Sequence, residues 1–285
     1  MNRLKIAVQK KGRLSEKSLE LLRACGIQLS NGDRKLKAEA VNFPIEVLFL
    51  RDDDIPQYVE QGVADIGFLG ENEVWEKSKN VQLLDRLGFA RCKLSLAIPK
   101  DETYNDLSYF NGKKVATSYP VILAKFFKEN KIEAGIEEIG GSVEIAPGIG
   151  LAHSIFDIVS TGSTLLMNGL KEVEVVLHSE AVMIATTHMK PAVQEILEQL
   201  RFRIRAVQHA YAHKYILLNA PDTALDDITA MLPGMKSPTI LPLAKKGWSS
   251  LHSVVKEDEF WDVIHQLKSI GAEGILVVPI EKMVL

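Results

Sequence analysis

Apolar and polar residues alternate along the N-terminal part of the chain in the order expected of strands and helices. Residues 4–8 form a short apolar run that predicts a buried strand, and a polar loop separates it from a helix that begins at about Ser15. A second strand is expected over 45–50, followed by a helix over 55–61 and a strand that ends in glycine at Gly70. The accumulating strand-helix-strand order predicts an α/β fold.

The same pattern restarts at Leu94 and predicts a second α/β lobe. Its expected elements are a strand at 114–117, a helix at 121–130, a short helix at 151–155 and a strand that ends at Val159. One more strand, at 181–185, and a helix, at 191–202, can then return the chain to the first lobe. The sequence permits two crossings between the lobes but does not locate them.

The C-terminal part has a different order of expected strands and helices. Its expected order is β-α-β-β-α-β, over residues 214–219, 222–232, 239–243, 250–255, 257–270 and 275–280. This order is the signature of a ferredoxin-like unit. We therefore expect a two-lobed α/β region followed by an α+β ferredoxin-like C-terminal domain.

Composition narrows the classes of protein that this chain can be. At 285 residues, with 46% hydrophobic and 25% charged residues, it has the balance of a globular protein of several compact units. The net charge of -3 argues against a nucleic-acid surface, so an anionic ligand would need locally placed cations. Cys25 and Cys92 lack metal-ligand spacing and are expected to be reduced structural thiols. Because we see no signal-peptide or membrane-spanning run, we expect a cytoplasmic protein that contacts no membrane.

Residues 157–165, Asp-Ile-Val-Ser-Thr-Gly-Ser-Thr-Leu, carry the most specific chemical pattern in the chain. Ile158 and Val159 end a strand, and the residues after them offer backbone N–H groups and hydroxyl donors that can cradle a phosphate. An acid just before such a turn, here Asp157, can hold ribose hydroxyls or a phosphate-bound Mg²⁺. An ordinary strand-to-helix turn, whose hydroxyls cap backbone groups, explains the same residues about as well.

Charged residues after two other strands are weaker candidates. Lys10, Lys11 and Arg13 lie on the loop after the first strand, where ligand groups of an open α/β sheet gather. A solvated basic loop is the simpler interpretation of that cluster. The Asp52-Asp53-Asp54 run favours a helix cap over a metal site, with Asp54 capping the helix at 55–61.

Taken together, these patterns resemble the ATP phosphoribosyltransferase family, whose members open histidine biosynthesis. Residues 157–164 are similar to the family's loop for 5-phosphoribosyl pyrophosphate (PRPP), and other segments match in the family's order. They are segments 7–14, 51–56, 140–147 and 237–240. The C-terminal domain resembles the regulatory domain of the long form, which binds histidine. Its presence argues against the short form, which needs a separate regulatory partner.

The resemblance implies an architecture and a reaction. The two lobes would have a periplasmic-binding-protein-like fold, with lobe I at 1–92 plus about 179–205, lobe II at 93–178 and the regulatory domain at 206–285. Adenine N1 of ATP would attack the anomeric carbon of PRPP to give N1-(5-phosphoribosyl)-ATP, and pyrophosphate would leave with Mg²⁺. Histidine would inhibit the enzyme, and the chain would form dimers and hexamers. The reaction requires no obvious general base, and we assign none.

The resemblance also implies roles for individual residues. For PRPP binding it implies Asp157, on the ribose hydroxyls, with Ser160, Thr161, Gly162, Ser163 and Thr164. For ATP binding it implies Lys10, Arg13, Arg51, Asp65 and Glu71. For catalysis it implies Lys10, Arg13, Glu144 and Asp157, with Glu144 near the Mg²⁺-pyrophosphate end. For allosteric histidine it implies Asn219, Thr239 and Gly274; some relatives have an acid at the Asn219 position, whereas Asn brings no charge.

Some observations leave other interpretations open. His153 departs from the family pattern, in which many members carry Asp, and we expect it on a face of the short helix at 151–155 rather than in catalysis. A non-enzymatic two-lobed small-anion-binding or regulatory protein is the main alternative function, weakened by the phosphate-type turn. A catalytically silent paralogue is disfavoured by the presence of Lys10, Asp157 and Gly162.

Overall fold

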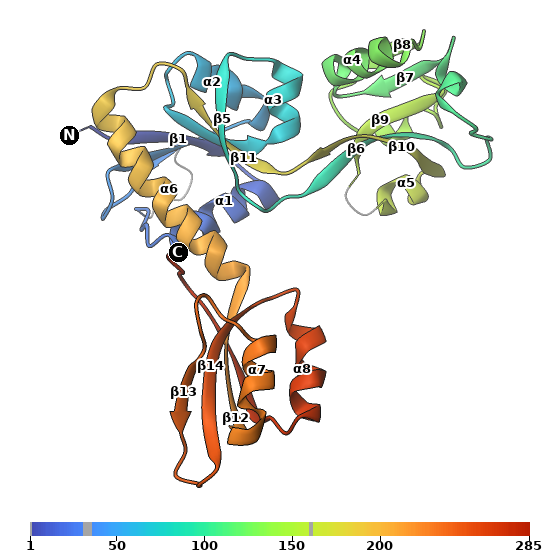
Figure 1. Cartoon of the computed structure of the whole chain (residues 1–285). Coiled ribbons are helices and arrows are strands. Elements are labelled where there is room, and N and C mark those ends of the chain that lie inside the picture. Colours follow the sequence, from blue (N-terminus) through green and yellow to red (C-terminus); the bar gives the residue numbers. More distant parts are fainter. Residues whose placement is uncertain (1, 31–35, 160–161) are drawn as a thin grey trace. The chain divides into compact units, whose positions relative to one another are not determined.

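The structure of the protein is a computed structural model that describes residues 2–30, 36–159 and 162–285. Within these residues the chain forms three sheets, and Figure 1 labels elements of each. It divides into two compact units: Met1–Glu20 with Ile27–Leu197, and Leu21–Gly26 with Glu198–Leu285. The first unit contains two of the sheets, and the second contains the third.

The first sheet has six strands in the order β2-β3-β1-β4-β11-β5. Their bounds are β1 Leu4–Gln9, β2 Lys37–Glu39, β3 Ile45–Leu50, β4 Ile66–Gly70, β5 Val81–Arg86 and β11 Ala181–Thr186. β1 pairs in parallel with β3 and β4, whereas β11 pairs antiparallel with β4 and β5. Every residue of β11 is buried, as expected of an interior strand covered on both faces.

Three short helical segments follow the parallel strands of this sheet. They are α1 Arg13–Ala24, the 3₁₀ turn η1 Asp52–Asp54 with α2 Ile55–Glu60, and α3 Glu71–Lys77. The expected cap at Asp54 is wrong, because its side chain makes no capping hydrogen bond. Asp54 has helical backbone angles, φ -86° and ψ -25°, since η1 runs straight into α2, and a capping residue usually needs an extended backbone.

The second sheet has five strands in the order β10-β6-β9-β7-β8. Its elements are β6 Cys92–Pro99, η2 Leu107–Phe110, β7 Lys114–Thr117, α4 Pro120–Asn130, β8 Gly135–Glu138, η3 Val143–Ile145, β9 Ser154–Val159, α5 Ser163–Met167 and β10 Leu170–Ser179. β7 is parallel to β8 and β9, and β6 is antiparallel to β9 and β10. Its core is rich in aromatic residues, with Phe110, Phe127 and Phe156 almost fully buried.

The short helix expected at 151–155 is absent, and His153 therefore lies on no helix face. Residues 151–153 are irregular, and β9 begins at Ser154. The His153 backbone N–H donates to the Lys114 carbonyl oxygen at 2.9 Å, and the His153 Nδ1 accepts from the Lys114 N–H at 3.0 Å. These two hydrogen bonds tie His153 to the first residue of β7 in place of a helical turn.

Two chain segments connect the first sheet with the second, and the first of them pairs with Ala181, the first residue of β11. One joins β5 to β6 and the other joins β10 to β11. Leu87 N–H donates to the Ala181 carbonyl at 2.8 Å, and Ala181 N–H donates to the Phe89 carbonyl at 2.9 Å. The expected two-lobed α/β architecture with two crossings is thereby confirmed.

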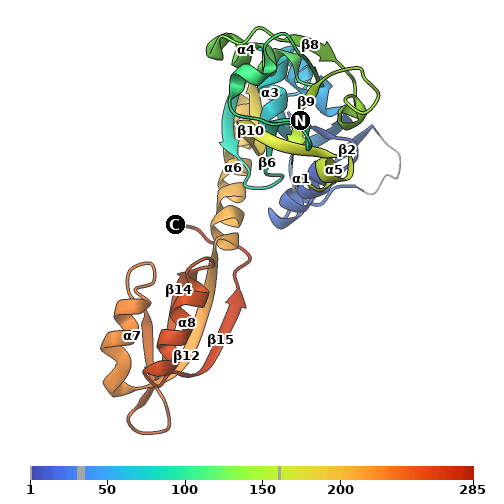
Figure 2. The same cartoon turned by 90° about the vertical axis from the view of Figure 1, so that its right-hand side faces the viewer.

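The third sheet has four strands in the order β13-β14-β12-β15. Its elements are β12 His213–Pro221, η4 Asp222–Ala224, α7 Leu225–Met231, β13 Thr239–Pro242, β14 Trp248–Lys256, α8 Phe260–Ser269 and β15 Glu273–Pro279. All neighbouring strands are antiparallel, and α7 and α8 lie on one side of the sheet (Figure 2). Buried and less buried residues alternate along β12 and β14, so one face carries the core. The expected ferredoxin-like order is confirmed.

Helix α6, Pro191–Tyr211, is longer than the segment 191–202 that the sequence indicates. Its apolar positions continue beyond Phe202 at Ile204, Val207 and Ala210, all of which are buried. Within the described residues, no helix is both long enough and apolar enough to cross a bilayer.

Candidate active site

Several candidate residues gather at one edge of the first sheet, where its parallel strands end. Lys10 follows β1, Arg51 follows β3 and Glu71 follows β4, and these strands run in parallel in neighbouring positions. Lys10 and Arg51 are exposed, and so is Arg13, the first residue of α1. The Gln9 side chain donates from Nε2 to Asp52 Oδ2 at 3.2 Å, which ties the end of β1 to η1. This edge therefore offers exposed cations to an anionic ligand.

Asp65 does not lie at this edge. It directly precedes β4, so it lies at the opposite end of that strand from Gly70. Its Oδ2 accepts a hydrogen bond of 2.7 Å from the Lys5 backbone N–H at the start of β1. Burial raises the pKa of the Asp65 carboxyl above its ordinary value, against the lowering effect of that hydrogen bond. The structure thus gives Asp65 a role in joining two strand starts.

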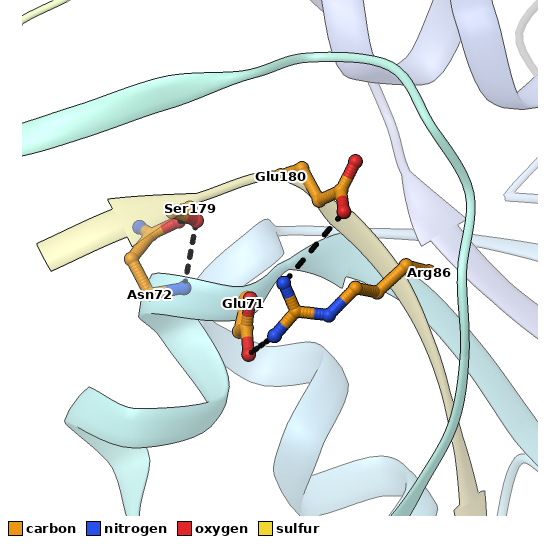
Figure 3. Close-up of polar contacts among 5 residues, drawn as sticks. All are labelled: Glu71, Asn72, Arg86, Ser179 and Glu180. Carbon is orange, nitrogen blue, oxygen red and sulfur yellow. Dashed lines mark hydrogen bonds and ion pairs between the residues drawn. The ribbon is translucent and has the colours of Figure 1, made fainter.

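Glu71 lies at the same edge of the first sheet as Lys10 and Arg51, but its side chain pairs with Arg86. It is buried, and its Oε1 accepts from Arg86 Nη2 at 2.6 Å. Figure 3 shows the Arg86 guanidinium between Glu71 and Glu180. Its Nη1 lies 3.7 Å from Glu180 Oε1. The Glu71 N–H also donates to the Glu180 carbonyl at 2.9 Å, so the start of α3 is joined to the crossing between β10 and β11.

Next to Glu71, a group of buried polar residues that the sequence analysis did not single out connects the two lobes. Asn72 accepts from Ser179 Oγ at 2.9 Å through Oδ1, and its backbone N–H donates to that Oγ at 3.1 Å (Figure 3). Its Nδ2 donates to Glu73 Oε1 at 3.2 Å and to the Tyr119 hydroxyl at 3.3 Å. Tyr119 directly precedes α4 of the second lobe. The only sequence signal for this group was the run of polar residues that follows the glycine-terminated strand β4.

In the second lobe the structure brings Asp157 and Glu144 together. Asp157 lies on β9, and its Oδ1 accepts from the Ile158 N–H at 2.8 Å. The pKa of the Asp157 carboxyl is raised to about 6, mainly by burial and also by the nearby Glu144 carboxylate, against the lowering effect of the Ile158 N–H. A carboxyl in this state favours a cation or hydroxyl donors as partners.

Ile158 and Val159 lie between Asp157 and the segment expected to form the phosphate-type turn. Gly162 has a φ of +75°, a conformation that glycine adopts readily and other residues rarely. Ser163 and Thr164 after it are exposed, and Leu166 N–H donates to the Gly162 carbonyl at 3.1 Å. Ser160 and Thr161, also expected to bind the phosphate, lie outside the described residues.

The donor set fits a metal ion that arrives with a ligand. In the described part of the chain, no group of three or more His, Cys, Asp or Glu side chains could hold a metal ion. Glu144 and Asp157 nevertheless offer two neighbouring carboxylates, the hard oxygen ligands that Mg²⁺ takes. Since Mg²⁺ commonly keeps waters and shares substrate phosphates, a partial protein shell is compatible with it.

The residues expected for effector binding lie on the face of the third sheet that α7 and α8 leave open. Asn219 on β12 pairs with Ser250, and Thr239 on β13 pairs with His252, two residues along β14. A Cβ added at Gly274 would lie 3.4 Å from Asn219 Nδ2. Asn219 and Gly274 are therefore adjacent, and Thr239 lies beyond the intervening strand β14.

Comparison with known proteins identifies the family of this chain. The sequence profile described as ATP phosphoribosyltransferase matches residues 51–206, and that of the C-terminal domain of HisG matches residues 210–282. The ATP phosphoribosyltransferase of Bacteroides thetaiotaomicron is 58% identical over 282 residues, covering 99% of this chain and 100% of that one. The chain belongs to the ATP phosphoribosyltransferase family. Because both profiles and full-length relatives match, it is of the long form.

Other members of the ATP phosphoribosyltransferase family support the same assignment. The enzyme of Cytophaga hutchinsonii is 57% identical over 281 residues, covering 99% of this chain and 98% of that one. A chain of the Thermotoga maritima ATP phosphoribosyl transferase (HisG:HisZ) complex superposes with a TM-score of 0.61 at 28% identity, covering 71% of this chain and 98% of that chain. The chain is thus a pentosyltransferase of histidine biosynthesis, in a family that acts with a divalent metal.

Proposed function

We propose that the two lobes divide the substrates of the reaction, with PRPP held by the second lobe and ATP by the first. The observation that supports this proposal is the end of β9, where Asp157 lies near Glu144 and precedes Gly162 and α5 along the chain. Such a carboxyl before a hydroxyl-rich turn suits a ribose phosphate, which presents hydroxyls and a phosphate at the two ends of one small molecule.

For PRPP, Asp157 would accept hydrogen bonds from the ribose hydroxyls. The turn at Gly162, Ser163 and Thr164, together with Ser160 and Thr161, would hold the 5′-phosphate through backbone N–H groups and hydroxyls. Glu144 would lie near the pyrophosphate. Mg²⁺ bound to that pyrophosphate would supply the charge neutralisation that the leaving group needs.

For ATP, the exposed cations at the first sheet's edge would hold the triphosphate. Lys10, Arg13 and Arg51 are the candidates, since a chain with a net charge of -3 must concentrate positive charge locally to bind two anions. We leave Asp65 and Glu71 out of this set, because one lies at the opposite edge and the other pairs with Arg86.

The chemistry needs alignment and charge stabilisation more than a covalent intermediate. The adenine N1 lone pair forms the bond to C1 of the ribose while the bond from C1 to the pyrophosphate oxygen breaks. Positive charge that develops on the ribose would be stabilised by the carboxylate of Asp157. Holding N1 and C1 about 3–3.5 Å apart supplies much of the rate enhancement.

The regulatory and quaternary proposals rest on the third sheet. We propose that histidine binds at Asn219, Thr239 and Gly274 and inhibits the enzyme, that the chain assembles into dimers and hexamers, and that it works in the cytoplasm with Mg²⁺. We also propose that lobe I comprises 1–92 plus about 179–205, that lobe II comprises 93–178 and that the regulatory domain comprises 206–285. Sedimentation with and without histidine tests the assembly.

The experiment for this proposal is formation of phosphoribosyl-ATP, followed by its ultraviolet absorbance, from ATP, PRPP and Mg²⁺. We expect turnover by the wild type, suppression by histidine, and loss of turnover in Asp157→Ala. Lys10→Ala should mainly raise the KM for ATP. Lys128→Ala, at the exposed far end of α4, is the matched control and should behave as the wild type.

Two outcomes would contradict the proposal. Full activity in folded Asp157→Ala would remove the proposed PRPP site. A Lys10→Ala variant whose KM for PRPP rises while that for ATP does not would reverse the assignment of substrates to lobes.

A further inference from the structure

Glu73 is a buried carboxyl near the start of α3 that no sequence motif indicates. It is 8% exposed, and its Oε1 accepts a hydrogen bond of 3.2 Å from Asn72 Nδ2. Asn72 is itself held by Ser179 at the crossing and by Tyr119 of the second lobe. Glu73 therefore has a fixed position at the edge of the first sheet where Lys10 and Arg51 also lie.

The groups that face Glu73 come from three elements. Burial, and to a smaller extent the carboxylates of Asp52 and Asp53 in η1, raise the pKa of the Glu73 carboxyl to about 7. Lys77 on the same helix and the hydroxyl of Tyr119 before α4 lower it. The result is a carboxyl that can take and release a proton near neutral pH.

Tyr119 relates Glu73 to the second lobe. The pKa of its hydroxyl is raised by burial, by the Glu73 carboxylate and by the Asp157 carboxylate. Glu73 from the first lobe and Asp157 from the second are therefore both close enough to act on one hydroxyl group. A ribose held by Asp157 would place its C1 near the Tyr119 hydroxyl. The adenine N1 that attacks C1 must come within about 3.5 Å of C1.

The attack creates a proton that needs an acceptor. When neutral adenine forms a bond through N1, the ring gains a positive charge that is shared with the exocyclic amino group N6. The N6 hydrogens become more acidic as the bond forms. A carboxylate hydrogen-bonded to N6 is therefore bound more strongly in the transition state than in the ground state, which is the condition for catalysis.

We propose that Glu73 accepts a hydrogen bond from adenine N6 and takes one N6 proton as N1 bonds to C1 of the ribose. The N1 lone pair forms the new bond, and the bonding pair from C1 leaves on the pyrophosphate oxygen. The electron pair of the broken N6–H bond forms the C6–N6 double bond, so the product base is neutral, and Glu73 later releases its proton to water. This inference rests on the proposed binding of ATP by the first lobe.

The test is a set of pH–rate profiles between pH 5.5 and 9, measured in single turnover with enzyme in excess. The wild-type rate should fall as the pH drops below about 7, because a protonated carboxyl cannot accept the N6 proton. Glu73→Gln should slow the chemical step by about 10²–10⁴-fold and lose the limb near pH 7, keeping only that of Asp157 near pH 6, with the KM for PRPP little changed. Glu73→Asp should restore part of the rate and the limb.

Glu76→Gln is the matched control. Glu76 is also buried on α3, one turn along, but its oxygens accept from the backbone of α4. This variant should keep the acidic limb even if its stability changes. Glu73→Gln should unfold in urea no earlier than the wild type above pH 7, since it removes a buried charge, so its loss of rate cannot reflect unfolding.

These outcomes distinguish the role of Glu73 from the proposed binding of ATP by the first lobe. An acidic limb that persists near pH 7 in Glu73→Gln, or a rate equal to that of the wild type, would overturn the role of Glu73 while leaving the substrate assignment intact. A Lys10→Ala variant with an unchanged KM for ATP, together with Glu73→Gln that reacts normally, would overturn both.

Discussion

The Glu76 carboxylate of α3 accepts a hydrogen bond of 3.0 Å from the backbone N–H of Val121, in the first turn of α4. Its second oxygen accepts from Ile122 N–H, also at 3.0 Å. A residue of the first lobe thus caps a helix of the second. Pro120 at the start of α4 has no N–H to satisfy, so this carboxylate serves the next two donors.

Replacing Glu76 by Ala should destabilise the first unit by about 1–2 kcal/mol, because two helix N–H groups lose a charged acceptor. Urea unfolding gives the free energy, and hydrogen exchange at Val121 and Ile122 should quicken. Glu129→Ala, at the exposed end of α4, should change stability by less than about 0.5 kcal/mol. Unchanged protection of the Val121 and Ile122 amides would show that the cap is dispensable.

Gly162→Ala should impair use of PRPP while leaving the protein folded. A Cβ at a φ of +75° costs about 1 kcal/mol, and relief of this strain would displace the turn that follows Asp157. We expect the kcat/KM for PRPP to fall at least about 10-fold, since small misplacements of a bound substrate slow reactions strongly. Gly148→Ala is the control, because its added Cβ would only come within 3.5 Å of the Ile145 carbonyl oxygen. Equal losses in both variants would count against a specific role for the turn.

Asp157→Asn should abolish turnover yet stabilise the free protein at neutral pH. The pKa of Asp157 is raised to about 6 in the folded state, so its favourable contribution is complete below the unfolded pKa of about 4 and is lost as the pH rises through 6. At pH 7.5 the variant should gain about 1–3 kcal/mol over the wild type. The gain should shrink as the pH falls towards 4, which urea unfolding at several pH values can follow. A gain that does not depend on pH would mean that the charge of Asp157 is not its source.

Asn219→Asp should strengthen inhibition by histidine. A carboxylate beside Gly274 can pair with the effector's ammonium group, which the neutral amide cannot, and one charge-assisted hydrogen bond of about 1.4 kcal/mol corresponds to a tenfold change. We therefore expect the half-inhibitory histidine concentration to fall about 10-fold. Thr223→Asp, which adds the same charge at an exposed position in η4, should leave inhibition unchanged. Weaker inhibition in Asn219→Asp would place the ammonium group elsewhere.

The fold was predictable where burial follows a simple period. The strands predicted at 4–8, 214–219 and 250–255 match β1, β12 and β14 to within two residues, and the end of β4 at Gly70 was also predicted. Helix α3 was missed because its buried residues include Glu71, Asn72, Glu73 and Glu76, so it carries no apolar stripe. Its charged side chains are buried through partners that lie far along the chain, which no local pattern reveals.

The candidate site was predictable in the second lobe and less so in the first. Asp157 and Gly162 belong to one continuous segment, whose order alone indicated a strand end and a turn. Asp65 and Glu71 are both expected to bind ATP, but Asp65 lies at the end of β4 opposite to Gly70, and Glu71 pairs with Arg86. The order of strands in the sheet decides which acidic side chain has a protein partner and which is accessible to a ligand. The sequence does not show that order.

The order of strands in the first sheet also bears on how the chain is built during synthesis. β11 lies between β4 and β5, although more than ninety residues separate it from either along the chain. All strands of the second sheet, β6 to β10, lie within that interval. As the polypeptide leaves the ribosome, β4 and β5 therefore face each other with unpaired edges until residue 186 has emerged, the kind of exposure that invites aggregation. The sheet that begins the chain is the later of the two to be completed.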